Sequence, residues 1–172
     1  MVVIKTKDFV LRQYRKSDVD SLVNHINHKE IARNTLTVPY PYNQKDGIFW
    51  INKCLKEYGQ KKKEQLCLAI EIDKEIVGSI DITINNEHKG SLGYWIGEKY
   101  WGKGLMTRIV RNFVNYCFKE FKLKRIQAGI FPWNKGSRRV LEKNGFKFEG
   151  RLRKSEYKDG KCIDELMFAK IR

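Results

Sequence analysis

The sequence lacks any long hydrophobic run, and this bears on where the protein resides. None of its apolar runs approaches the ~20 residues that a membrane-spanning helix needs. The N-terminal stretch MVVIKTKDFVLRQY has too short an apolar core for a secretory signal peptide. Internal repeats, low-complexity tracts and linkers are not visible either. We therefore expect a cytoplasmic protein with no membrane partner.

Sequence signatures of metal binding and redox chemistry are lacking as well. The four cysteines are Cys54, Cys67, Cys117 and Cys162. None of them forms a C-x-x-C pair, so we expect buried free thiols in a reducing compartment. His25 and His28 stand three residues apart on an expected helix, a spacing that suits a metal ion. No third ligand lies near them, so we expect a solvated helix face and no metal.

Acidic residues are few relative to basic ones. The 20 Asp and Glu stand against 35 Lys and Arg, which gives a net charge of +15. This excess favours an anionic partner, such as nucleic acid, a ribosome surface or a phosphorylated cofactor. A basic surface kept for solubility explains it equally well. Few acids cluster along the chain, which argues against an acidic pocket for a polycationic small molecule.

The composition that remains is that of an ordinary globular protein. Hydrophobic residues make up 41% and charged residues 32% of the 172 residues. This length fits one domain, residues 1–172, and is long enough to bury a substantial core.

Hydrophobic periodicity predicts strands and helices in alternation. The expected strands are FVLRQY (Phe9 to Tyr14), QLCLAIEI, IVGSIDITI, SLGYWIG and RIQAGIF (Arg125 to Phe131). Four helices are expected. The first begins at Ser17 as N-cap, the second spans Gln44 to Tyr58, the third follows Gly102-Lys103-Gly104, and the fourth lies in NKGSRRVLEKNGF. A hairpin about Asp159-Gly160 ends the chain. The strand–helix–strand connection implies a parallel pair, so we predict an α/β or α+β fold with a mixed sheet and helices on both faces.

The stretch GYWIGEKYWGKGLMTRIV places two glycines between a strand and a helix. Glycines at a helix N-terminus let backbone N–H groups surround a diphosphate. The NTPase P-loop pattern is absent, and Thr107 stands where a dinucleotide fingerprint requires its last glycine. On these residues alone, a plain strand-to-helix turn is favoured over a phosphate site.

Several motifs in this order resemble the GNAT superfamily of N-acetyltransferases, and within it the ribosomal-protein N-terminal acetyltransferases of the RimJ/RimL type. They are GYWIGEKYWGKGLMTRIV, NKGSRRVLEKNGF, FVLRQYRKSDVDSL, VPYPYNQKDGIFWI and EGRLRKSEYKDGKCIDELMFA. The resemblance covers almost the whole chain. It implies a mostly antiparallel twisted sheet with one central parallel strand pair, acetyl-CoA as cofactor without a metal, and a homodimer as a possible assembly.

The resemblance also implies where the cofactor binds. Its pantetheine arm would pair with the free edge of one parallel strand, in a gap opened by a bulge, and an N–H near Trp95 or Ile96 would polarise the thioester. Laid on Trp101 to Met106, the pyrophosphate signature Gln/Arg-x-x-Gly-x-Gly/Ala matches strictly only at Gly104. The implied cofactor-binding residues are Trp95, Ile96, Gly97, Trp101, Gly102, Lys103, Gly104, Leu105, Met106, Thr107 and Asn134.

Two residues take catalytic roles by the same resemblance. Ser137 would protonate the departing thiolate, and Glu156 would act as the base that takes a proton from the acceptor amine. Asn134 and Ser137 also fit the first turn of a helix, with Asn134 as its cap. Glu156 also fits an exposed strand position.

The acceptor site is expected in the loop from Asn34 to Tyr42, the helix after it and the last hairpin. Its expected wall is aromatic: Tyr40, Tyr42, Trp50 and Tyr157. Aromatic clusters in a small domain are otherwise most often core.

Three functions remain open from the sequence. The first is acetyl-CoA-dependent transfer of an acetyl group to the N-terminal α-amine of a ribosomal or other protein. The second keeps the cofactor and takes a polyamine or another small-molecule amine as acceptor. The third is a non-catalytic basic module of the same fold that binds the ribosome or RNA.

Overall fold

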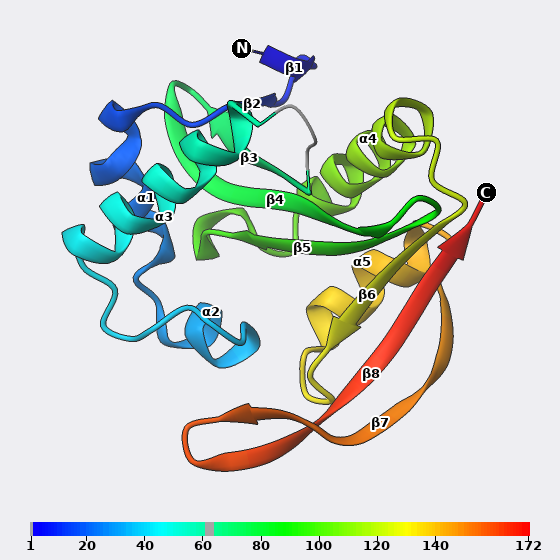
Figure 1. The fold of residues 1–172 in the computed structure, drawn as a ribbon. Coiled ribbons are helices and arrows are strands. Elements are labelled where there is room, and N and C mark those ends of the chain that lie inside the picture. The colour runs from blue at the N-terminus through cyan, green and yellow to red at the C-terminus, as the bar shows by residue number, and fades with distance from the viewer. Residues whose placement is uncertain (1, 61–63) are drawn as a thin grey trace.

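One eight-stranded sheet forms the centre of the computed structural model, which describes residues 2–60 and 64–172 (Figure 1). The strands are β1 (Val2–Lys5), β2 (Val10–Arg12), β3 (Gln65–Ile72), β4 (Glu75–Asn86), β5 (Lys89–Ile96), β6 (Arg125–Ile130), β7 (Lys147–Lys158) and β8 (Lys161–Ile171). They lie in the order β1-β2-β3-β4-β5-β6-β8-β7. Neighbouring strands are antiparallel except β5 and β6, which are parallel. The predicted mixed sheet with one central parallel pair is confirmed.

Helices cover both faces of this sheet, as predicted (Figure 1). They are α1 (Val19–Ile26), α2 (Lys29–Asn34), α3 (Gln44–Tyr58), α4 (Leu105–Glu120) and α5 (Lys135–Lys143), with short 3₁₀ turns η1 (Lys16–Asp18) and η2 (Glu98–Tyr100). The α1 and α3 helices pack on one face, and α4 and α5 pack on the other. Among the described residues, no helix is both long and apolar enough to cross a membrane.

Helix α4 shows why the sequence pattern is a sound guide to the core. Its apolar positions recur at steps of three and four, which places them on one face of the helix. Ile109, Val110, Phe113 and Cys117 are fully buried against the strands. The predicted helix after Gly102-Lys103-Gly104 is therefore confirmed, with its apolar face in the main core.

The N-terminal third departs from the expected elements. The helix does not begin at Ser17: that residue lies inside η1, and α1 starts at Val19. A separate short helix, α2, was not predicted, because its six residues carry too little periodicity to detect. His25 and His28 are therefore not on one helix. His25 lies in α1, whereas the His28 ring caps α2 by accepting a hydrogen bond from the Glu30 N–H at 3.2 Å.

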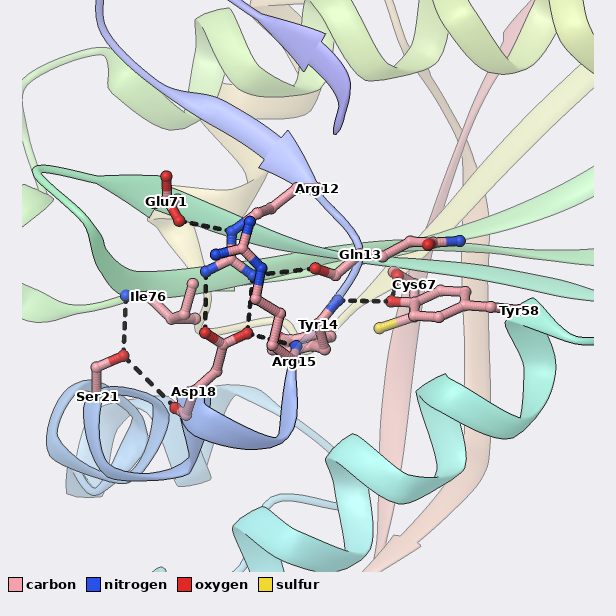
Figure 2. A network of polar contacts seen from close by, with 10 residues as sticks. All are labelled: Arg12, Gln13, Tyr14, Arg15, Asp18, Ser21, Tyr58, Cys67, Glu71 and Ile76. Carbon is pink, nitrogen blue, oxygen red and sulfur yellow. Dashed lines mark hydrogen bonds and ion pairs between the residues drawn. The ribbon is translucent and has the colours of Figure 1, made fainter. Parts of the chain in front are cut away.

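A buried ion pair fixes the start of the chain to the sheet and to α1 (Figure 2). The Arg12 guanidinium on β2 donates to both carboxylate oxygens of Asp18, at 2.8 and 2.9 Å, and to Glu71 on β3 at 2.5 Å. Both Arg12 and Asp18 are less than 10% exposed. Burial alone would lower the pKa of Arg12, but its bonds to Asp18 and Glu71 outweigh that effect and raise it. Arg12 therefore stays charged, and the two carboxylates stabilise its buried charge.

We expect Asp18→Ala to lower the free energy of unfolding by about 3–5 kcal/mol, because it leaves the buried Arg12 charge without its bidentate partner. Urea denaturation followed by circular dichroism measures the loss. Glu142→Ala is the matched control, since it removes an exposed partner of Arg138 in α5 and should cost less than about 0.5 kcal/mol. Equal losses in the two variants would show that the Arg12 network does not hold the N-terminal segment in place.

Candidate active site

The parallel strands β5 and β6 pair over only three residues and then part. Their paired positions are Lys89 with Arg125, Gly90 with Ile126 and Ser91 with Gln127. Beyond them, β5 runs on to Ile96 and β6 to Ile130 without pairing to each other. The expected bulge at the gap is not there: β4 and β5 stay in register from Ile96 to Gly90, and the shift in this ladder lies between Ile84 and Asn86.

Backbone groups of β5 are left facing this gap. The Gly97 N–H donates to Val77 of β4 at 2.8 Å, whereas the Ile96 carbonyl accepts from the Trp101 indole at 2.7 Å. Successive residues of an antiparallel strand direct their N–H and C=O groups to opposite sides. The N–H groups of Tyr94 and Ile96 therefore face the gap, and those of Trp95 and Gly97 face β4.

At the end of β5, the Gly102-Lys103-Gly104 turn leads into the N-terminus of α4. Both glycines have positive φ, +73° at Gly102 and +68° at Gly104, a conformation that glycine adopts without strain. The first bond of α4 runs from the Arg108 N–H to the Gly104 carbonyl. The N–H groups of Leu105, Met106 and Thr107 consequently have no partner within the helix and present a partial positive charge.

A cavity of about 490 Å³ opens in front of this helix N-terminus. Most of the predicted cofactor residues line it: Trp95, Ile96, Trp101, Gly102, Gly104, Leu105, Met106, Thr107 and Asn134. Gly97 and Lys103 are outside that lining, and the Lys103 amine lies 6.0 Å from the centre of the Tyr100 ring. Four basic side chains that were not predicted also line the cavity: Arg33, Lys135, Arg139 and Lys143. Free N–H groups and basic side chains suit a ligand that carries phosphates.

Trp101 and Met106 occupy the positions where the sequence departs from the superfamily signature. The indole of Trp101 is 40% exposed, is held by its bond to Ile96 and meets the His28 ring edge-on at 5.5 Å. Met106 is buried in the core beneath the turn. Neither side chain fills the space in front of the N–H groups, because the cavity remains open there.

Tyr94 and Ser137 meet between this first cavity and a second one. The two hydroxyl oxygens lie 2.7 Å apart, and the Ser137 N–H donates to the Asn134 side chain at 3.0 Å. Asn134 therefore caps α5, as the helix-end interpretation of these residues predicted. Burial raises the pKa of the Tyr94 phenol, so it is protonated at neutral pH. Six residues line both cavities: Asn34 and Thr35 at the end of α2, and Tyr94, Trp95, Asn134 and Ser137 at this junction.

The second cavity, here called the chamber, has a volume of about 630 Å³ and an acidic lining. Its charged residues are Asp46, Asp81, Glu156, Glu165 and Lys53. The four carboxylates come from α3, β4, β7 and β8, so they are far apart in the sequence and close in the fold. The scarcity of acid clusters along the chain therefore says nothing about this site, and the argument drawn from it against a cationic acceptor fails.

Two of these carboxylates lie against glycines of the parted strands. A Cβ atom at Gly93 would be 2.8 Å from the Asp81 carboxylate, and one at Gly129 would be 1.8 Å from that of Glu165. The absence of a side chain at both positions thus makes room for the acids. Burial raises the pKa of Asp81 to about 6, although Gln65 and Lys53 oppose the shift. Burial, followed by the charge of Glu156, also raises the pKa of Glu165.

The four predicted acceptor aromatics lie in different places. Tyr42 and Trp50 line the chamber, and Tyr42 is also packed in a small apolar cluster with Ile26 and Ile31. Tyr40 is half exposed and lines a third, outer groove, with its ring 5.8 Å from the Lys29 amine. Tyr157 is 69% exposed and lies outside the described linings of all three cavities.

Sequence reasoning missed Tyr94, Asp81 and Glu165. Tyr94 lies in the expected strand SLGYWIG, and the two-residue alternation of a strand does not reveal its contact with Ser137 of α5. Asp81 gave no clear signal either, because it alternates with the isoleucines of IVGSIDITI and shares its strand face with Ser79 and Thr83. Glu165 gave none, because its approach to Gly129 depends on the pairing of β6 with β8.

The sequence and fold of this chain are similar to those of known acetyltransferases. Residues 8–147 match the family defined as the acetyltransferase (GNAT) domain. An uncharacterized N-acetyltransferase of Bacillus licheniformis, p20, is 27% identical over 100% of this chain and 97% of its own. The [ribosomal protein uS5]-alanine N-acetyltransferase of Escherichia coli is 33% identical over 56% of this chain and 52% of its own.

A solved structure gives the same fold at low sequence identity. The ribosomal L7/L12 α-N-protein acetyltransferase RimL, in complex with coenzyme A, superposes with a TM-score of 0.87 at 20% identity, over 99% of this chain and 98% of that chain. The family match spans most of the chain, including the parted strands, the Gly102-Lys103-Gly104 turn and α5. The chain therefore belongs to the GNAT family of acetyltransferases.

Proposed function

We propose that the protein transfers an acetyl group from acetyl-CoA to the N-terminal α-amine of a protein, with ribosomal proteins as the first candidates. One observation carries the proposal: a cavity suited to phosphates and a chamber lined by carboxylates meet at Tyr94, Trp95, Asn134 and Ser137. A thioester placed at this junction would face an amine held as a cation in the chamber. The relatives described above support the acceptor class, since two of them are ribosomal-protein acetyltransferases.

The cofactor would be held mainly by main-chain groups. The free N–H groups of Leu105, Met106 and Thr107 suit its diphosphate, and the basic side chains of α5 suit its remaining phosphate. The N–H groups of Tyr94 and Ile96 suit its pantetheine arm. Of the two predicted oxyanion donors, Ile96 is the one whose N–H faces the gap, so we assign that role to Ile96 rather than Trp95.

Acetyl-CoA supplies the activated acetyl group, and residues of this chain move the protons. A bound ammonium must lose a proton before its nitrogen can attack the thioester carbon. We assign Asp81 as the base that accepts this proton. A carboxylate with a pKa of about 6 is ionised at neutral pH and is more basic than an ordinary carboxylate. Glu156, the base predicted by resemblance, also lines the chamber, and we assign it to holding the ammonium.

The sulfur that leaves needs a proton in return. The hydroxyls of Ser137 and Tyr94 are bonded to each other at the junction, so Ser137 would donate to the thiolate while Tyr94 supplies its replacement. In the balanced reaction, a C–N bond forms and the C–S bond breaks. The ammonium gives up two protons in all. The first goes to Asp81, and the second leaves the nitrogen of the tetrahedral intermediate and restores the hydroxyl pair after Ser137 has protonated the thiolate.

A polyamine is a second candidate acceptor, favoured by one specific observation. The chamber holds four carboxylates and one lysine, which is more negative charge than a single ammonium requires.

Thiol release from acetyl-CoA, measured with short peptides bearing a free α-amine and with a set of polyamines, tests the proposal. We expect release with the peptides and none when their α-amine is already acetylated. Absence of turnover with every acceptor, together with absence of acetyl-CoA binding in calorimetry, would show that the chain is not a working acetyltransferase.

We expect Gly104→Glu to weaken acetyl-CoA binding about tenfold to a hundredfold, because a carboxylate would stand beside the diphosphate. Calorimetry measures the dissociation constant. Gly160→Glu is the matched control: Gly160 has φ +77° in the β7–β8 turn, with no described atom within 4 Å of its added Cβ, so the backbone cost is similar, and it lies outside the described lining of the cofactor cavity. Equal affinities of the two variants for acetyl-CoA would show that the diphosphate does not bind at this turn.

We expect Asp81→Asn to lower kcat about a hundredfold near pH 7.5, because the variant cannot take the ammonium proton. The ratio of wild-type to variant kcat/KM cancels the titration of the acceptor itself. This ratio should be constant above pH 6 and fall about tenfold for each pH unit below it, since Asp81 then becomes protonated. If the fall of kcat/KM below pH 6 disappears in Glu156→Gln but persists in Asp81→Asn, then Glu156 is the base.

A further inference from the structure

A third cavity, here called the outer groove, lies next to the chamber. It is open, has a volume of about 900 Å³, and runs between α2, the loop that follows it and the far end of the β7–β8 hairpin. Figure 1 shows this hairpin curling beneath α2. The loop residues Leu36, Thr37, Val38 and Pro39 line both the outer groove and the chamber, so the two spaces share one wall.

The charge of the outer groove is opposite to that of the chamber. Its basic lining residues are Lys29, Arg33, Arg151, Lys158 and Lys161, against the acids Asp159 and Asp164. Both acids have partners already: Asp164 pairs with Arg151 at 2.6 Å, and Asp159 lies 4.0 Å from Lys158. Among the ion pairs of the described residues, Lys29 and Lys161 have no acidic partner.

Flat aromatic surfaces accompany these cations. The Lys29 amine lies 5.8 Å from the centre of the Tyr40 ring, and the Arg33 guanidinium lies 5.6 Å from that of Trp133. Both rings are exposed, at 50% and 36%. Exposed rings beside fixed cations give the groove apolar surface for an extended chain, together with donors for its carboxylates.

This arrangement discriminates between acceptors. A free polyamine would satisfy the acidic chamber, but any part of it that reached the outer groove would meet like charge. A polypeptide can carry both charges in the required order, with a cationic α-amine in the chamber and acidic side chains after it. We infer that the acceptor is a polypeptide whose N-terminal residues are followed by an acidic segment, and that this segment binds in the outer groove. The inference rests on the proposed function, because it extends the same acceptor site.

Three hexapeptide amides that differ only at residues three to five, which are acidic, neutral or basic, test the inference. They are Ala-Ala-Glu-Asp-Glu-Tyr, Ala-Ala-Gln-Asn-Gln-Tyr and Ala-Ala-Arg-Arg-Arg-Tyr, each with its α-amine as the one primary amine. We expect kcat/KM to be at least about fivefold higher for the acidic peptide than for the neutral one, and lowest for the basic one. The preference should shrink between about 50 and about 500 mM NaCl, because salt screens exposed charges.

The double variant Lys29→Glu/Lys161→Glu locates the effect. It should abolish or reverse the preference for the acidic peptide while leaving kcat/KM for the neutral peptide within about twofold of wild type. The matched control is Lys119→Glu/Lys124→Glu, two exposed positions at the end of α4 and after it, outside the described linings of the three cavities. This control changes the net charge equally and should keep the preference.

Other outcomes overturn the inference in distinct ways. Equal kcat/KM for the three peptides would remove the outer groove from acceptor selection. Acetylation of spermidine but of no peptide would make the acceptor a polyamine and leave acetyl transfer intact. A 20-nucleotide RNA that binds wild type but not the Lys29→Glu/Lys161→Glu variant, without any peptide preference, would assign the groove to nucleic acid. Failure with every acceptor, and no acetyl-CoA binding, would instead refute the proposed function.

Discussion

The parting of β5 from β6 is the constraint on which the rest of the site depends. After Ser91 and Gln127 the two strands no longer share hydrogen bonds, so β5 keeps an open edge in the middle of an otherwise continuous sheet. An open edge of this kind binds an extended ligand as an added strand would. Every other part of the site is arranged around this gap: the α4 N-terminus at one end, the Tyr94–Ser137 pair at the centre and the chamber at the other end.

Charge is separated among the three cavities. The protein carries +15 overall, yet four carboxylates line the chamber, while basic residues line the cofactor cavity and the outer groove, which both adjoin it and share Arg33 and Trp133 with each other. Phosphates, an ammonium and an acidic segment would each meet the opposite charge in turn. Net charge alone pointed to an anionic partner and gave no sign of the chamber, which favours a cation.

The sequence predicted what depends on local pattern. Helix α4, the β3–β4 hairpin, the last hairpin and the parallel pair follow from periodicity, turn residues and connection handedness. Features that depend on long-range pairing were not predictable in this way. Asp81 reaches the chamber because β4 pairs with β5 at Gly93, and Glu165 does so because β8 pairs with β6 beside Gly129. The short helix α2 was not predictable for a different reason: its six residues give no clear hydrophobic period.

The central claim is that the cofactor arm occupies the gap beside β5, and amide hydrogen exchange followed residue by residue by NMR tests it most directly. In the free protein the Tyr94 and Ile96 N–H groups face the gap, whereas the Gly97 N–H is bonded to β4. On adding acetyl-CoA, protection should rise about tenfold or more at Tyr94 and Ile96 and change little at Trp95 and Gly97. Bound acetyl-CoA with unchanged exchange at Tyr94 and Ile96 would contradict the account.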